Sequence, residues 1–380
     1  MSTDNGSYPP WVQDTGTEAG TEERSAAGPW AALPPPPATL LARDKAEPAA
    51  PWSALPAPAQ PAAPAPVKVT PPTLDDLLAD RPAPPMGPAK TGWRAIVRRA
   101  SAGVVALPPG PAEVRHRTAV AAVQRSLNGP KTVVVVNPKG GAIKTTTTLM
   151  IARTLGIHRG GYVLGWDNNE TRGTMGWRAN PARHTNTAVD LLRDLDRFAD
   201  VRSARVGDLD NYVRSQGDAQ FDVLASDEDA ESSASIDAAA FKDLHRTLSR
   251  FYRVMVVDTG NNMRASNWEA AVAEADQLVI VSTVREDTSQ SAAWMADALN
   301  TSGRGELVAK AVTVLAEPAA VPDKALRARL HRHFGQLTRA VVDIPYDPAL
   351  IGGGPIAYDA LSSASHAAWL QATAAIAEGL

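Results

Sequence analysis

The sequence of 380 residues contains no cysteine, and this absence removes several classes of function at once. Disulfide frameworks, thiolate metal sites, cysteine nucleophiles and cysteine-held iron–sulfur clusters all need that side chain. The sequence also lacks an apolar run long enough to span a bilayer, and its first residues, MSTDNGSYPP, show no basic segment followed by an apolar one. We therefore expect a cytoplasmic protein with no membrane partner.

Large apolar residues are scarce in the first quarter of the sequence, where the prolines crowd together. Residues 34–37, for example, are consecutive prolines. Proline donates no backbone hydrogen bond, and too few large apolar side chains are present to offset the entropy cost of ordering this stretch. Residues 1–91 are therefore predicted to form a disordered, extended arm that favours the polyproline II conformation.

Positive charge is concentrated directly after the arm. Between residues 91 and 131 the only acidic residue is Glu113, whereas the basic residues are Arg94, Arg98, Arg99, Arg115, Arg117, Arg125 and Lys131. Helical patterns near residues 93–102 and 113–127 predict a basic helical neck over residues 92–130. Two interpretations remain open for its charge, contact with a polyanion or a solvated and internally paired linker.

Short valine-rich runs alternate with helical patterns from residue 131 to residue 380. Strands covered on both faces by crossover helices show this pattern. The runs are residues 132–136, 162–166, 221–225, 254–257, 278–282, 311–315 and 341–344. They predict one α/β domain over residues 131–380 with a doubly wound, mostly parallel sheet, and we expect its chemistry at the edge where the strands end.

The strongest local motif, VVVVNPKGGAIKTT at residues 133–146, leads from the first predicted strand directly into a helix. Glycines permit a tight turn whose backbone N–H groups converge on phosphate oxygens, and the helix N-terminus adds positive potential. Lys144 contributes a point charge, and Thr145 can ligate Mg²⁺. The expected cofactor-binding residues are Lys139, Gly140, Gly141, Ala142, Ile143, Lys144, Thr145 and Thr146.

This motif resembles the deviant Walker A sequence KGGxGKTT of the ParA/MinD family of P-loop ATPases. The resemblance implies ATP and Mg²⁺ as cofactors and a nucleotide-dependent homodimer. In such a dimer Lys139 would reach the phosphates of the other subunit, while Lys144 would bind those of its own site. Ile143 departs from the pattern, since the family has glycine there and a β-branched residue is poorly suited to an unusual φ. That departure predicts weakened or abolished nucleotide binding.

Two further predicted strands end in a carboxylate. Asp167 can orient an attacking water or act in the second shell of magnesium, so it joins Lys139 as a catalytic candidate. Most ParA and MinD proteins have D-x-D here, but Asn169 takes the second acidic position, as in an actinobacterial subgroup with the pattern D-x-N-P-D-x-G-T-L, which implies slow turnover. Asp258 resembles the Walker B acid and is, with Thr145, the expected metal ligand.

The resemblance extends over about residues 92–380. The segment 343–347, DIPYD, is similar to the family's I-P-x-D sequence beside the adenine, which makes Pro345 and Asp347 cofactor candidates. Formation of a local turn explains these two residues equally well. The basic neck and the proline-rich arm resemble actinobacterial ParA/MinD-like proteins that are encoded near type VII secretion systems.

A predicted helix over residues 322–337 carries a basic face that could follow DNA phosphates without reading sequence. Its DNA-binding candidates are Lys324, Arg327, Arg329 and Arg332, although a plain solvated helix has the same pattern. We expect a ParA-like partition ATPase that binds nonspecific DNA and responds to a ParB-like stimulator. The alternatives are a type VII secretion accessory ATPase that engages a secretion component through the arm, and a non-hydrolysing nucleotide-binding scaffold.

Overall fold

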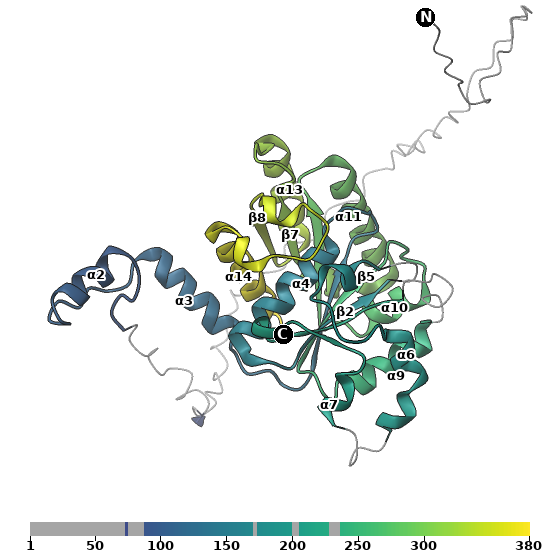
Figure 1. Cartoon of the computed structure of the whole chain (residues 1–380). Coiled ribbons are helices and arrows are strands. Elements are labelled where there is room, and N and C mark those ends of the chain that lie inside the picture. Colours follow the sequence, from purple (N-terminus) through teal and green to yellow (C-terminus); the bar gives the residue numbers. More distant parts are fainter. Residues whose placement is uncertain (1–72, 75–86, 170–172, 200–204, 228–235) are drawn as a thin grey trace, which may run out of the picture. The chain divides into compact units, whose positions relative to one another are not determined.

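The computed structural model describes residues 73–74, 87–169, 173–199, 205–227 and 236–380, and it divides the chain into two units, Met1–Arg81 and Pro82–Leu380. The predicted arm lies almost wholly outside the described residues and stays a prediction. All strands described below, and the helices that cover them, belong to the second unit (Figure 1).

Eight strands form one sheet in the order β3-β4-β2-β5-β1-β6-β7-β8. Neighbouring strands run parallel except β3, which pairs antiparallel with β4 at one edge. The strands are β1 (Lys131–Val136), β2 (Val163–Asn168), β3 (Arg214–Ser215), β4 (Asp222–Leu224), β5 (Val254–Thr259), β6 (Gln277–Thr283), β7 (Val312–Ala316) and β8 (Ala340–Ile344). The predicted doubly wound, mostly parallel α/β sheet is therefore confirmed.

Side chains of the central strands alternate between two hydrophobic cores, because successive residues of a strand point to opposite faces. Val134 and Val136 of β1 belong to one core, whereas Val133 and Val135 belong to the other, and all four are fully buried. A strand that is buried on both faces reads as a continuous apolar run, which is why the valine-rich segments identified the sheet.

Helices cover both faces of the sheet (Figure 1). One face packs against α3 (Pro111–Val123), α4 (Lys144–Leu155), α5 (Met175–Arg178) and α14 (Ser363–Ala377). The other packs against α6 (Ala188–Arg193), α9 (Ala238–Leu248), α10 (Ser266–Ala273), α11 (Glu286–Leu299), α12 (Gly305–Lys310) and α13 (Lys324–Leu337). The short helix α7 (Val206–Leu209) and several single helical turns lie between these elements.

The basic neck consists of α2 (Gly92–Ala100) and α3, close to the predicted helices. Part of its charge is used within the neck. Arg94 donates to the carbonyl oxygens of Pro108 and Pro109, and Arg117 pairs with Glu113, whose carboxylate also accepts the backbone N–H of Lys90. Internal contacts thus involve Arg94 and Arg117, and both interpretations of the neck's charge stay open.

Every strand except β3 was predicted from the sequence, with ends within two residues of those observed. β3 has only two residues, Arg214–Ser215, and forms a short antiparallel edge. A strand of that length has no periodicity that a sequence pattern could reveal.

Candidate functional site

The carboxyl ends of three central strands bring the predicted site residues together. β1 leads into the phosphate loop, residues 137–143, and β5 lies between β1 and β2. The register pairs Asp258 of β5 with Val135 of β1 on one side and with Asp167 of β2 on the other. Lys144 and Thr145 begin α4 directly above these strand ends. Residues far apart in the sequence therefore converge on one edge, as expected for an open α/β sheet.

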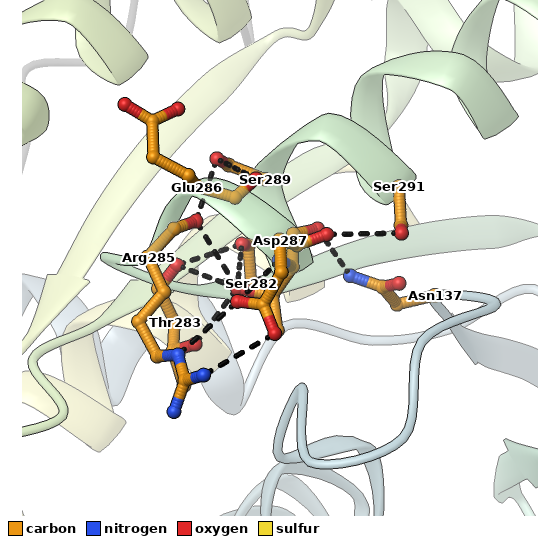
Figure 2. Close-up of polar contacts among 9 residues, drawn as sticks. Asn137, Ser282, Thr283, Arg285, Glu286, Asp287, Ser289 and Ser291 are labelled. Atoms are coloured by element: carbon orange, nitrogen blue, oxygen red, sulfur yellow. Dashed lines mark hydrogen bonds and ion pairs between the residues drawn. The ribbon is translucent and has the colours of Figure 1, made fainter. Parts of the chain in front are cut away.

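The phosphate loop is anchored to the neighbouring strand and helix by Asn137, a fully buried residue. Figure 2 shows its contact with the first turn of α11. Its Nδ2 donates to the carbonyl oxygens of Val281 at 2.7 Å and Thr288 at 3.1 Å, which lie at the end of β6 and the start of α11. Its Oδ1 accepts the backbone N–H of Lys139 at 2.8 Å. These three hydrogen bonds fix where the loop leaves the sheet.

The backbone of the loop is left-handed at two positions. Gly141 has a φ of 78°, which glycine adopts at little cost, but Ile143 has a φ of 64° and a ψ of 22°. A β-branched residue in this region is strained by about 1–3 kcal/mol. The structure therefore places Ile143 in the backbone conformation that makes glycine preferable there, while its side chain packs against the apolar core below.

The two lysines of the motif lie in different surroundings. Lys144 is buried, and its Nζ donates to Oδ1 of Asn261 at 2.7 Å and to the carbonyl oxygen of Lys139 at 3.3 Å. Lys139 itself is exposed at the top of the loop. One ammonium group is thus held inside the site, and the other is accessible from outside.

A hydroxyl and a carboxylate suited to magnesium meet beneath the loop. Thr145 Oγ1 donates to Asp258 Oδ2 at 2.6 Å. Two further carboxylate oxygens are also buried, Oδ1 of Asp258 and Oδ1 of Asp167. Neither has a hydrogen-bond partner among the described residues. Buried carboxylate oxygens of this kind fit a hard cation. The described part of the chain has no cluster of three or more acidic or histidine side chains, so a cation there would need further ligands from water or from a phosphate.

Burial disfavours the ionised form of the Asp258 and Asp167 carboxylates. Desolvation raises the pKa of Asp258 to about 7, and the charge of Asp167 acts in the same direction. Desolvation likewise raises the pKa of Asp167 to about 6, against the opposing effect of the Met175 N–H, which donates to its Oδ2 at 3.1 Å. A bound cation would favour the charged form of both groups.

Gly173 explains how Asp167 is enclosed. A Cβ atom at this glycine would lie 2.0 Å from Asp167 Oδ2 and 2.1 Å from Ser226 Oγ, so any larger residue would displace one of these two side chains. The Gly173 N–H donates to the Ser226 hydroxyl at 3.1 Å. Asn169, at the position of the family's second acidic residue, lies two residues after Asp167 and is partly buried.

A cavity of about 330 Å³ opens beside the phosphate loop. This P-loop cavity is lined by Gly141, Ile143 and Thr146 on one side and by Pro345 and Asp347 on the other. Its volume lies at the lower end of the range for small-molecule sites. The isoleucine therefore borders the cavity without filling it. The carboxylate of Asp347 accepts the N–H groups of Ala349 and Ser362, so this side chain also shapes its own loop.

Three charged residues that border the P-loop cavity were not among the predicted site residues: Arg178, Arg285 and Glu317. Arg285 directly precedes α11 and is held by Asp287 through Nε and Oδ1 at 3.1 Å (Figure 2). Glu317 follows β7 and pairs with Arg327 at 3.2 Å, while its buried Oε2 has no partner among the described residues. None of the three lies in a recognisable motif, so only the tertiary structure could reveal them.

The basic helix proposed for DNA contact is α13. Arg327 is paired with Glu317, and Arg329 with Glu286, whereas Lys324 and Arg332 form no ion pair with a described residue. Half of the four candidate cations are therefore neutralised by neighbouring carboxylates. DNA binding by this helix stays a prediction.

Comparison with known proteins gives the fold its name. A crystal structure of a ParA family ATPase from Chlorobium tepidum TLS superposes with a TM-score of 0.52 at 18% sequence identity, over 65% of this chain and 98% of that chain. This chain has the ParA/MinD ATPase fold. The resemblance stated from the sequence is confirmed at the level of the fold.

Two curated sequences are also similar to this ParA/MinD-like chain. It is 26% identical over 300 residues to the ESX-1 secretion-associated protein EspI from two strains of Mycobacterium tuberculosis, CDC 1551 / Oshkosh and ATCC 25618 / H37Rv. That alignment covers 76% of this chain but 42% of EspI, so the chain spans less than half the length of the curated relatives it matches. No family model matches the sequence.

Among the residues that the structure describes, no helix combines the length and the apolar character that a transmembrane span requires.

Proposed function

We propose that this protein is a Mg²⁺- and ATP-binding switch with slow hydrolysis of ATP to ADP and phosphate. The observation that carries the proposal is the contact between Thr145 Oγ1 and Asp258 Oδ2, 2.6 Å long, beside the buried ammonium of Lys144. A hydroxyl, a carboxylate and a cation in this arrangement serve a metal–polyphosphate complex and have little use otherwise.

Different residues of the site would bind the phosphates, the metal and the attacking water. The phosphate loop and Lys144 would bind the phosphates, while Thr145 and Asp258 would hold Mg²⁺. The metal, when bound, neutralises phosphate charge. Asp167 lies beside Asp258 and would orient a water molecule or accept its proton. The P-loop cavity, with Pro345 at its far side, would accept the nucleoside.

Slow turnover is part of the proposal. The family's second acidic residue is replaced by Asn169, which cannot act as a base. The strained backbone at Ile143 also opposes the fit of the loop to a phosphate chain. Both departures weaken the chemistry while leaving a binding site in place.

We further propose that ATP binding builds a homodimer through Lys139. This lysine is exposed at the loop, and no ion pair with a described residue holds its ammonium group. A cation at the mouth of a phosphate site can act on a phosphate carried by a second copy of the chain.

The test is titration of the full chain with ATP and Mg²⁺, following affinity, molecular mass and phosphate release. Lys144→Ala should abolish ATP binding, whereas Lys139→Ala should bind ATP as a monomer but fail to dimerise. Lys131→Ala and Lys310→Ala are matched controls, because Lys131 lies at the other end of β1 and Lys310 is an exposed lysine on α12. Equal affinity of the wild type and Lys144→Ala would refute the nucleotide site.

For the cellular role, we propose an accessory function in type VII secretion in preference to DNA partitioning. Two observations support this choice. The curated relative EspI is described as ESX-1 secretion-associated, and the ion pairs of Arg327 and Arg329 reduce the free positive charge on α13. The arm, residues 1–91, is then the proposed contact to a secretion component.

The two roles predict different binding. A partition ATPase would be retained on DNA in the presence of ATP and released by salt, and Lys324→Glu with Arg332→Glu would abolish that retention. A secretion accessory would show no ATP-dependent retention and would instead need residues 1–91 to co-purify with secretion components. ATP-dependent, salt-sensitive DNA retention by the full chain would reverse our preference.

A further inference from the structure

We propose that Arg178 is a second nucleotide-binding cation, which binds the phosphate nearest the nucleoside. The proposal rests on the nucleotide site described above and adds a residue that no sequence motif indicated. Arg178 ends the short helix α5, which follows β2.

The guanidinium of Arg178 contacts the phosphate loop directly. Its NH1 donates to Thr146 Oγ1 at 2.6 Å. Thr146 lies in the first turn of α4, two residues after Lys144. An arginine in this position sits beside the backbone N–H groups that a phosphate chain would use.

The same guanidinium also contacts the opposite wall of the P-loop cavity. Its NH2 donates to the carbonyl oxygen of Leu350 at 3.3 Å, although the two residues are 172 positions apart in the sequence. Leu350 lies in the loop that carries Pro345 and Asp347, and both Arg178 and Leu350 line the cavity. Arg178 therefore spans the boundary between the phosphate loop and the space proposed for the nucleoside.

No carboxylate of the described residues lies within ion-pair distance of Arg178. The Nε of this side chain is buried with no hydrogen-bond partner among them. Partial burial lowers the pKa of the guanidinium, and the negative charge of Asp258 opposes that effect, so the group stays cationic. A partly buried cation is costly unless an anion accompanies it, and a phosphate would supply that anion with the bidentate geometry that guanidinium prefers.

The neighbours of Lys144 and Arg178 indicate which phosphate of the nucleotide each side chain would bind. Lys144 points to Asn261, in the loop after β5 and close to the proposed metal ligands. Arg178 contacts Thr146 and Leu350, on the side of the cavity. Lys144 thus serves the distal phosphates, and Arg178 serves the phosphate attached to the nucleoside.

The experiment is a binding series with adenosine, AMP, ADP and ATP on the full chain, using wild type, Arg178→Gln and Arg178→Lys. We expect Arg178→Gln to weaken AMP, ADP and ATP by a similar factor, roughly 10- to 100-fold, and to leave adenosine unchanged. Arg178→Lys should show a smaller loss, because lysine keeps the charge but not the fork. Arg153→Gln is the matched control, since Arg153 is also partly buried and stacks over Tyr358 at 4.7 Å without lining the cavity.

Each outcome is decisive. Unchanged ADP and ATP affinity in Arg178→Gln would overturn the proposal, as would an equal loss in Arg153→Gln. A loss confined to ATP would also overturn it, because the contact would then be to the terminal phosphate. If the wild type binds no nucleotide at all, the proposed function fails, whereas wild-type binding that is lost in Lys144→Ala but kept in Arg178→Gln removes only this inference.

Discussion

Asp167 and Asp258 are direct neighbours on the parallel strands β2 and β5, and each keeps one buried carboxylate oxygen that no described residue satisfies. Two buried acids side by side repel each other once both are ionised, so the arrangement is unfavourable in the absence of a cation. Such pairs mark functional sites more often than they stabilise folds. A cation beside the two unsatisfied oxygens would relieve that repulsion.

This pair predicts an unusual dependence of stability on pH. The pKa of each acid rises on folding from 3.8, to about 7 for Asp258 and about 6 for Asp167. At pH values between the unfolded-state and folded-state pKa of these acids, the folded state holds more protons than the unfolded state. The free energy of unfolding therefore falls as pH rises from about 4 to about 7. Asp258→Asn removes one of the two groups. We expect thermal melts of the nucleotide-free variant to lose less stability between pH 5 and pH 8 than the wild type.

The control for the pH experiment is Asp243→Asn, which changes an exposed acid paired with Arg246. Its melting temperature should follow the wild type across the same pH range. If Asp258→Asn follows the wild type equally well, the two carboxylates are not coupled to folding as described. Mg²⁺ with ATP should restore stability at pH 8 in the wild type but not in Asp258→Asn.

Asn261 is predicted to compete with phosphate for Lys144. Its Oδ1 accepts from Lys144 Nζ at 2.7 Å, so a bound phosphate would have to displace it. Asn261→Ala should raise ATP affinity by a few fold, whereas Asn261→Asp should lower it by roughly tenfold, because an ion pair holds the lysine more firmly. Isothermal titration measures both. A loss of affinity in Asn261→Ala would show that Asn261 assists binding.

Two substitutions of Ile143 distinguish the effect of backbone strain on ATP binding and turnover from the effect of side-chain bulk. Ile143→Gly removes both, and Ile143→Ala removes the bulk while keeping a Cβ atom at a φ of 64°. We expect Ile143→Gly to bind ATP more tightly and to turn over faster than the wild type, with Ile143→Ala close to the wild type. The stability of Ile143→Gly should change by about 1 kcal/mol or less, because relief of strain offsets lost packing. Equal gains in both variants would assign the effect to bulk.

Glu317 is predicted to select the base. It lines the P-loop cavity and has a buried carboxylate oxygen without a partner among the described residues, which suits the exocyclic amino group of adenine. ITP presents an oxygen at that position, so the wild type should prefer ATP over ITP by roughly tenfold. Glu317→Gln should lower the ratio of ATP affinity to ITP affinity, since the glutamine amide can donate a hydrogen bond to the oxygen of ITP. Asp323→Asn changes an exposed acid at the start of α13 and should leave the ratio unchanged. A ratio near one in the wild type would exclude this role.

Local sequence patterns determined the fold and the motif residues of this protein. Strands such as β1 and β5 are buried on both faces and therefore appear as apolar runs in the sequence. The phosphate-loop motif, a strand end followed by Gly140, Gly141 and Lys144, is also local, so it can be recognised without knowing the rest of the structure. Ile143 was also identified from the sequence alone, because the conformation of a phosphate loop constrains each of its residues separately.

Only the tertiary structure decided which other side chains join the site and which charges remain free. Arg178 meets Leu350 across 172 positions, and Glu317 neutralises Arg327 while it borders the P-loop cavity. Such contacts depend on how the loops after separate strands pack together, and no spacing within the sequence encodes them. The register of β2 against β5 likewise turned two separate acids into one coupled pair, because hydrogen bonding between strands fixes which residues become neighbours.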